Sequence, residues 1–145
     1  GTEEGPIRWK GQGSVLHDVT SDSTSKWGAA GMLTTNLKDM RKFAEAFFRG
    51  TLLNEASRKE QRRFRDTGYP VDYRYGFALS AYEDTEGHNG FIPGYQACVA
   101  YHRSSDTIII VLTNLYSSPN WEEPANYLFF TAMRWLTGKN YQPRL

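Results

Sequence analysis

Residues 75–115 read YGFALSAYEDTEGHNGFIPGYQACVAYHRSSDTIIIVLTNL, and this stretch decides the fold. It contains three runs of apolar, aromatic and β-branched residues, each bounded by turn residues, and such runs predict β-strands. The runs cover residues 75–82, 95–101 and 107–115, and residues 103–106 form a short polar turn between the last two. The third run is apolar without a break, which predicts a strand buried on both faces.

The composition indicates one folded domain. The chain has 145 residues, of which 39% are hydrophobic and 23% charged, so it can bury a core and is not a disordered composition. Its net charge of +1 and its pI of about 8.0 give no strong attraction to nucleic acid or to an anionic membrane. No apolar run is long enough to span a bilayer. The single cysteine, Cys98, excludes an internal disulfide and a Cys-based zinc site, and we expect it to be a small core residue.

Two helices are expected before the strands. Asn36 is a good N-cap for the first helix, and Gly50 is a C-terminal stop. A second helix is expected from Asn54 to Arg65, where basic residues mixed with acids indicate a solvated face instead of a binding patch. The first helix has one apolar face, formed by Leu37, Met40, Phe43, Ala44, Phe47 and Phe48.

The two ends of the chain differ. Residues 1–27 are rich in Gly, Ser, Thr and Asp, with short strand-like pieces at residues 7–10 and 14–17. After the third strand, residues 117–120 end the sheet and cap a last helix that Gly138 stops. Glu122, Glu123 and Pro124 suit its first turn. Its predicted apolar face consists of Ala125, Leu128, Phe129, Ala132, Trp135 and Leu136.

A histidine among glycines beside these strands is the best candidate for chemistry. The triplet His88-Asn89-Gly90, followed by Pro93-Gly94, resembles the strand motif Lys/His, Ser/Thr, Gly of the serine β-lactamases of class C and the related D-alanyl-D-alanine carboxypeptidases and esterases. Asn89 departs from the usual hydroxyl residue. The small-residue turn Ala29-Ala30-Gly31 and the helix after Asn36 resemble a second block of that family, in the same order along the chain.

The resemblance implies a fold. We expect an α+β chain in which an antiparallel sheet of three or more strands carries a packed C-terminal helix and a further amphipathic helix. This is the C-terminal part of a β-lactamase/transpeptidase-like fold. Residues 1–145 would then be a single incomplete domain with four parts: an irregular lead-in (1–27), a helical block (28–65), the sheet (73–115) and the C-terminal helix (119–138).

The resemblance also implies roles for residues. His88 would take the place of the motif's Lys or His and hydrogen-bond a proton-handling group or a substrate carboxylate. Asn89 and Gly90 would contact the substrate, and the backbone N–H of Phe91 would be one oxyanion donor. The alternative is that His88 is a turn-adjacent polar residue on an exposed strand. Gly87, Gly90 and Gly94 also permit the close approach of another backbone or of a ligand.

Acyl transfer by a serine needs a nucleophilic hydroxyl and a base. In the resembled family these come from Ser-x-x-Lys and Tyr-x-Asn or Ser-x-Asn, far before the Ala-Ala-Gly block, so we expect this chain to lack the nucleophile. Ser23-Thr24-Ser25-Lys26 matches Ser-x-x-Lys, but Trp27-Gly28 follows where an apolar helix is needed, which favours an exposed loop. Ser118-Pro119-Asn120 matches the Ser-x-Asn triplet and is better explained as a loop and helix cap.

The expected function is therefore the C-terminal portion of a serine hydrolase acting on a D-alanyl peptide, a β-lactam or a small ester. The alternative is a non-catalytic binding or self-associating module, with a homodimer formed through an exposed sheet. We expect no metal site, because the three scattered histidines lack acidic partners at ligand spacing, and no cofactor. The small net charge favours no nucleic-acid partner. His17 and His102 are expected to be surface residues. An extracytoplasmic or periplasmic address would follow if the parent behaves like its family.

Overall fold

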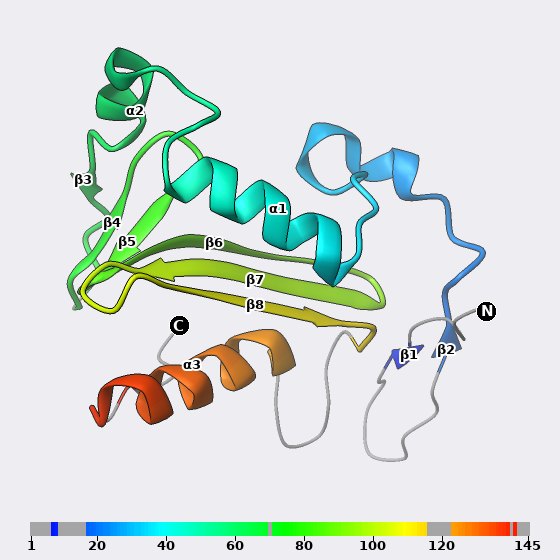
Figure 1. Ribbon diagram of the computed structural model, residues 1–145. Coiled ribbons are helices and arrows are strands. Elements are labelled where there is room, and N and C mark those ends of the chain that lie inside the picture. Colours follow the sequence, from blue (N-terminus) through cyan, green and yellow to red (C-terminus); the bar gives the residue numbers. More distant parts are fainter. Residues whose placement is uncertain (1–6, 9–16, 70, 116–122, 140, 142–145) are drawn as a thin grey trace. The chain divides into compact units, whose positions relative to one another are not determined.

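The computed structural model describes residues 7–8, 17–69, 71–115, 123–139 and 141 (Figure 1). Its helices are the 3₁₀ helix η1 (Thr24–Ala30), α1 (Leu37–Phe48), α2 (Glu55–Gln61) and α3 (Pro124–Thr137). Its strands are β1 (Ile7–Arg8), β2 (His17–Asp18), β3 (Arg65–Asp66), β4 (Tyr73–Tyr75), β5 (Ser80–Tyr82), β6 (Thr85–Ile92), β7 (Tyr95–His102) and β8 (Thr107–Thr113).

The strands form one short pair and one larger sheet. β1 and β2 pair antiparallel, and the other six strands follow each other in the order β3-β4-β5-β6-β7-β8. The α+β class, the antiparallel sheet, the amphipathic helix and the C-terminal helix expected from the resemblance are confirmed. The chain divides into two compact units, residues 1–35, 89–98 and 111–145 in the first, and residues 36–88 and 99–110 in the second. The description of residues 1–145 as one incomplete domain stays a prediction.

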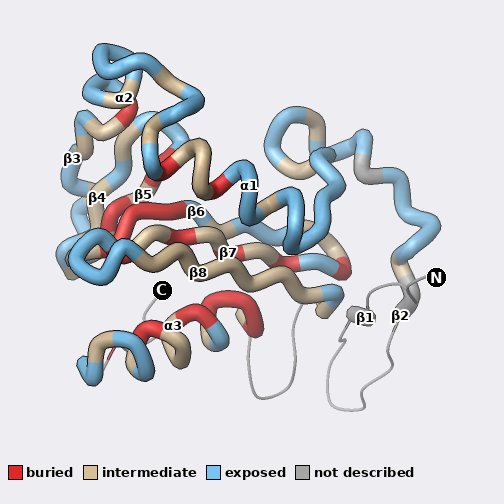
Figure 2. The backbone as a smooth tube through the Cα atoms, viewed as in Figure 1, coloured by how far each residue is buried: buried red, intermediate tan, exposed pale blue. Residues whose placement is uncertain are grey.

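The second unit has its core under α1. The Asn36 side chain accepts a hydrogen bond from the Asp39 N–H at 3.0 Å, which confirms the predicted N-cap. Ala44 and Phe48 of α1 are buried together with Leu79, and the Phe48 ring stacks on Tyr101 with 5.6 Å between centroids. Figure 2 shows that α1 carries buried positions among exposed and intermediate ones. Residues packed against this core are Phe47, Phe64, Val99, Tyr101, Ile108 and Ile110.

The expected strand over residues 75–82 is not continuous. β4 ends at Tyr75 and β5 begins at Ser80, because the chain between them bends to bury Leu79. The bend is held by a hydrogen bond from the Gly76 N–H to the Leu79 carbonyl at 2.8 Å and by one from the Phe77 N–H to the Gln61 carbonyl at 2.9 Å. A Cβ at position 76 would lie 2.2 Å from that Gln61 oxygen, so only glycine fits there.

The second helix is shorter than predicted. α2 ends at Gln61, and Arg65, the expected last residue, belongs to β3. Two tight backbone hydrogen bonds, from Arg63 to Glu60 at 3.1 Å and from Phe64 to Arg62 at 2.7 Å, turn the chain out of the helix. The turn places Phe64 against the core, so tertiary packing overrides a helix-favouring sequence.

The first unit has its core on α3. Ala125, Phe129 and Met133 are buried on one side of this helix. Gln96 of β7 accepts a hydrogen bond from the Ala125 N–H at 3.1 Å and so satisfies one of the first amides of α3. The helix ends at Gly138, whose φ of 69° is left-handed, as the sequence predicts.

The predicted apolar face of α3 is wrong at one end. Trp135 is 90% exposed, and Leu128 and Leu136 are also exposed. At 100° per residue, Trp135 lies about 200° around the helix from the buried Met133. The helix therefore turns Trp135 away from the core. The residues expected to cap α3, 117–120, lie outside the described part of the chain.

β6 and β7 form a tight hairpin. Apolar periodicity does not mark residues 85–92 as a strand, because they are mostly polar residues and glycine, and only the resemblance places the His88 triplet on one. Pro93 and Gly94 make the two-residue loop, and the φ of 89° at Gly94 is the value that a turn with proline before glycine requires. Cys98 is 5% exposed on β7, which confirms it as a core residue, and burial raises its thiol pKa to about 12.

β8 is not the doubly buried strand that its sequence predicts. All seven residues are partly exposed, and β8 stands last in the order of the described sheet. An uninterrupted apolar run predicts a central strand, but its position at the edge leaves each side chain partly in contact with solvent.

Candidate active site

The four predicted site residues follow one another on β6. β5 pairs with only the start of this strand. The last pair joins Ser80 to Gly87, so the pairing ends immediately before His88. Because side chains alternate along a strand, His88 and Gly90 lie on one face and Asn89 and Phe91 on the other. His88, Gly90 and Phe91 are exposed and Asn89 is half-buried. The predicted motif is therefore on an exposed segment of β6.

His88 makes a side-chain hydrogen bond that the sequence analysis missed. Its Nε2 lies 2.7 Å from the Tyr75 hydroxyl, and the two rings meet edge to face with 5.8 Å between centroids. Tyr75 pairs with Ser80 and Ser80 pairs with Gly87, so the register brings the end of β4 level with the residue before His88, where the pairing of β5 with β6 ends. The sequence separation of 13 residues carries no local signal for this pair.

Asn89 and Gly90 have different surroundings. The Asn89 amide Nδ2 donates to Asn126 Oδ1 of α3 at 3.2 Å. A substrate contact by Asn89 stays a prediction, and Asn126 is the group that would compete with a substrate for this amide. A Cβ added to Gly90 would meet nothing within 4 Å, so there is open space beside this residue. The role of the Phe91 N–H as an oxyanion donor also stays a prediction.

A cavity of about 420 Å³ lies beside Tyr75 in the second unit. Tyr75 and Phe77 form the aromatic part of its wall, and Phe77 is 79% exposed. Charged residues of both signs complete the lining, and one opposite pair, Arg63 and Glu60, lies 3.6 Å apart. The remaining wall residues are Arg65, Asp66, Thr67 and Gly76.

In the first unit, the Ala29-Ala30-Gly31 block contacts the end of β6. A Cβ added to Gly31 would lie 2.8 Å from Ile92 Cγ2 and 3.2 Å from Trp27 Cβ. The absence of a side chain at Gly31 therefore allows the block to sit against the strand that carries the predicted motif.

A buried carboxylate, Glu86, anchors the start of β6. It is 4% exposed and accepts hydrogen bonds from Arg62 Nε at 2.8 Å and from Arg103 Nη1 at 3.3 Å. Two guanidinium groups thus compensate for the desolvation of one carboxylate. Arg62 belongs to the basic stretch that the sequence indicated to be a solvated face, and this interpretation is wrong for Arg62.

The turn after β7 covers His102. This histidine was expected at the surface, but it is 7% exposed, and its Nδ1 lies 2.7 Å from Ser105 Oγ. Asp84 stabilises this turn. Its carboxylate accepts hydrogen bonds from the Ser104 N–H at 3.0 Å, from the Ser104 hydroxyl and from Arg103 Nε at 3.1 Å. The prediction failed because the burial of His102 depends on this long-range closure.

We expect Asp84 to make stability depend on pH. Hydrogen bonds from the Ser104 hydroxyl, with further help from the Ser104 amide and Arg103, lower the Asp84 pKa from 3.8 to about 2. A carboxyl with a lower pKa in the folded state contributes stability above its unfolded pKa and loses that contribution as the pH falls toward 2. Because the side chain is 30% exposed, the contribution should be on the order of 1 kcal/mol.

The measurement is the free energy of unfolding in urea at pH values of about 7, 4 and 2.5, which span the interval between the folded and unfolded pKa values. The Asp84→Asn variant should be less stable at neutral pH and should lose less stability on acidification. Asp22→Asn is the matched control, because Asp22 pairs with Lys26 only on the surface. Equal pH profiles for wild type and Asp84→Asn would contradict the assignment.

Ser23 and Lys26 are not arranged as a nucleophile and base. Ser23 caps the short helix η1, and its Oγ lies 2.7 Å from Ser25 Oγ. The Lys26 ammonium lies 3.4 Å from Asp22 Oδ2 and 5.5 Å from the centre of the Trp27 ring. Both polar side chains are thus engaged locally and exposed. The Ser-x-Asn match, Ser118-Pro119-Asn120, lies outside the described residues.

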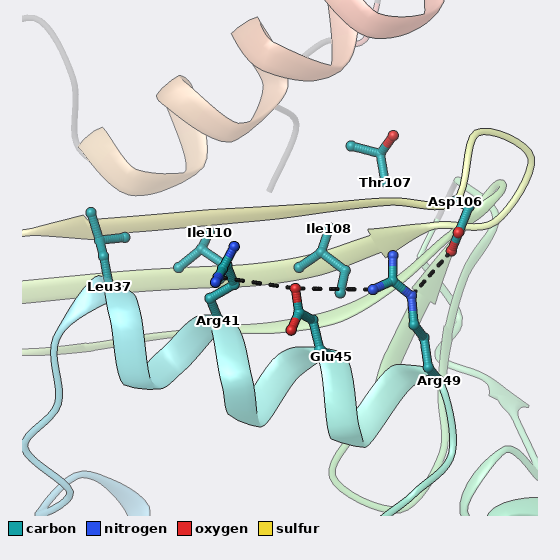
Figure 3. Close-up of a pocket in the computed structure, with 8 residues that line it drawn as sticks. All are labelled: Leu37, Arg41, Glu45, Arg49, Asp106, Thr107, Ile108 and Ile110. Atoms are coloured by element: carbon teal, nitrogen blue, oxygen red, sulfur yellow. Dashed lines mark ion pairs between the residues drawn. The ribbon is translucent and has the colours of Figure 1, made fainter.

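Another hollow of about 420 Å³ runs between α1 and β8 (Figure 3). Its charged residues pair with one another, since Glu45 lies 4.0 Å from both Arg41 and Arg49, and Arg49 lies 3.5 Å from Asp106. Its other lining residues are Leu37, Thr107, Ile108 and Ile110. This groove has no serine, cysteine or histidine among these lining residues, and its two carboxylates are held in ion pairs, so it is a poorer candidate for catalysis.

Two further properties of the chain bear on the site. Among the described residues, no helix has the length and apolar character needed to cross a membrane. The described part of the chain also contains no group of three or more His, Cys, Asp or Glu side chains placed to hold a metal ion.

Comparison with known proteins agrees with the fold. A family model described as β-lactamase matches residues 3–132. A solved structure, the D-stereospecific amidohydrolase from Streptomyces sp., is similar with a TM-score of 0.67 and 22% sequence identity. The match covers 79% of this chain and 35% of that one, so this chain spans about a third of the length of the amidohydrolase. No curated protein matches the sequence.

Proposed function

Because this chain belongs to the β-lactamase family, we propose that it supplies one wall of the substrate site in a serine hydrolase that cleaves an amide or ester through an acyl-enzyme. The observation that supports this proposal is the exposed His88 at the motif position of β6, on the same strand as the open space beside Gly90. The class C β-lactamases, the D-alanyl-D-alanine carboxypeptidases and the esterases are the branches that the motif favours.

The proposed chemistry assigns a role to each motif residue. A serine outside residues 1–145 attacks the substrate carbonyl and passes its proton to a base, and water later hydrolyses the acyl-enzyme. The N–H of Phe91 stabilises the oxyanion, and His88 hydrogen-bonds the proton-handling group or a substrate carboxylate. Asn89 and Gly90 line the substrate. The likeness to a D-stereospecific amidohydrolase makes an amide with a D-configured residue the first substrate to try.

The test is covalent labelling followed by peptide mass spectrometry. This chain, and separately the product of the longest open reading frame that contains it, would be treated with a fluorophosphonate and with a penicillin. We expect the longer protein to be labelled on a serine outside residues 1–145 and to be protected by a D-aminoacyl amide. An adduct on Ser23 would overturn the assignment of the nucleophile, and no adduct on either protein would overturn the hydrolase proposal.

A second candidate function is self-association, and β8 is the feature that favours it. The strand reads TIIIVLT, without charge or proline, although exposed sheet edges are normally protected by such residues. The neighbouring groove adds the apolar side chains of Leu37, Ile108 and Ile110. The partner we propose is a second copy of this chain, because its β8 offers the same apolar strand for antiparallel pairing.

A lysine on β8 should therefore weaken the dimer. Ile108 and Ile110 pack near the α1 core, so the change is placed between them, as Ile109→Lys. We expect a dimer weakened by about tenfold or more in light scattering over a concentration series, because a lysine on an edge strand opposes pairing. Leu33→Lys, at a residue that is 82% exposed and off this edge, is the matched control. A monomeric wild type at high concentration would exclude self-association.

A further inference from the structure

Tyr75 contacts the proposed catalytic histidine and has no role in the proposed chemistry. Its hydroxyl lies 2.7 Å from His88 Nε2, and the rings are inclined at 76° to each other. We propose that Tyr75 is a positioning residue that holds the His88 imidazole in one orientation and one tautomer. This inference rests on the proposed function of His88.

The backbone around Tyr75 is held in place by its contacts. Tyr75 pairs with Arg65 of β3 on one side and with Ser80 of β5 on the other. Ser80 Oγ in turn donates to the Gly87 carbonyl at 2.7 Å, which ties β5 to the residue before His88. Gly76 follows Tyr75 at a point where no side chain fits against the Gln61 carbonyl. The tyrosine ring thus projects from a backbone held on both sides.

The hydrogen bond has a chemical consequence for the imidazole. The Tyr75 hydroxyl can meet a neutral imidazole in two ways, by donating to an unprotonated Nε2 or by accepting from an Nε2–H. The tautomer included in the proposal is the first, in which the ring carries its proton on Nδ1. When the imidazole is protonated, both nitrogens are donors, and the Tyr75 oxygen can accept from Nε2 instead. The same contact therefore orients His88 in either protonation state, which a catalytic imidazole needs during a reaction cycle.

The location of Tyr75 also links His88 to the neighbouring cavity. Tyr75 forms part of the wall of the cavity of about 420 Å³, together with Phe77 and Thr67. The tyrosine is 38% exposed, so a group bound in this cavity would touch the ring that orients His88. The structure thus places Tyr75 between a space large enough for a side chain and the proposed catalytic imidazole.

The first test is spectroscopic and uses this chain. Long-range nitrogen–proton NMR spectra distinguish the tautomers of a histidine, and His88→Gln identifies the His88 signal. We expect a single tautomer with the proton on Nδ1 in the wild type and a mixture in Tyr75→Phe. Tyr69→Phe is the matched control, because the Tyr69 ring packs edge to face on Tyr73 and is 57% exposed. An unchanged tautomer in Tyr75→Phe would overturn the proposal.

The second test uses the hydrolase activity of the longer protein. Tyr75→Phe should lower kcat about tenfold and leave KM unchanged, because it alters the orientation of a catalytic group and not substrate binding. A normal kcat in Tyr75→Phe together with a low kcat in His88→Ala would overturn the positioning role. Normal kcat values in both variants, with a tautomer mixture in Tyr75→Phe, would instead overturn the proposed function of His88.

Discussion

Replacing Gly87 with alanine is expected to destabilise the protein by about 3 kcal/mol, at the upper end of the range for overpacking a well-filled interior. Gly87 is buried on β6, and an added Cβ would lie 2.4 Å from the Val99 carbonyl oxygen and 2.7 Å from the Ala100 Cα. These are backbone atoms of the adjacent strand, so the clash cannot be relieved by a side-chain rotation. β6 and β7 would have to separate, and the backbone hydrogen bonds between them would be lost around Gly87.

The control for this prediction is Gly90→Ala on the same strand. Neither glycine has a positive φ, so alanine strains neither backbone. A Cβ at Gly90 meets nothing within 4 Å, and the change should be neutral or stabilise the fold by less than about 1 kcal/mol. In urea, the midpoint should fall by more than about 1 M in Gly87→Ala only. Equal midpoints for the two variants would contradict the close approach of β6 and β7.

Replacing His88 with alanine in the longer protein is expected to lower kcat by about 100-fold, because the proton-handling group or the substrate carboxylate would lose the hydrogen bond that orients it. The imidazole is exposed, and it hydrogen-bonds Tyr75, itself on the surface, so the change should leave stability nearly unaltered. Loss of activity at constant stability is expected of a site residue. The Gly87→Ala variant should instead lose stability, and activity with it.

The readout is the hydrolysis of a D-aminoacyl p-nitroanilide and of its L isomer, with urea midpoints measured in parallel. Trp135→Ala is the control, since Trp135 is 90% exposed on α3. A His88→Ala enzyme with wild-type kcat would favour the alternative in which His88 is only a polar residue on an exposed strand.

The local part of this fold can be predicted from the sequence. Asn36 caps α1 and Gly138 ends α3 because these signals act within one helical turn. The strands over 95–101 and 107–115 are recognisable, because their apolar residues are bounded by turn residues. The match of His88-Asn89-Gly90, which lies within β6, to the family's site motif stays a prediction.

Several predictions that failed concern residues whose partners are far away in the chain. The bend after Tyr75 requires the Gln61 carbonyl, and the burial of His102 requires the turn that Asp84 holds. The hydrogen bond between Tyr75 and His88 needs the register of three strands, which is set by packing and turns and not by composition.

By itself, the sequence determined the start of α1, the end of α3, the class of the fold and the family, because the signals for each are patterns of neighbouring residues. Only the tertiary structure decided that β8 is an edge strand of the described sheet, that Glu86 is held between two arginines and that Tyr75 reaches His88. The physical reason is that burial, ion pairing and cross-strand contacts are properties of the packed chain. Local propensities are too weak to specify them.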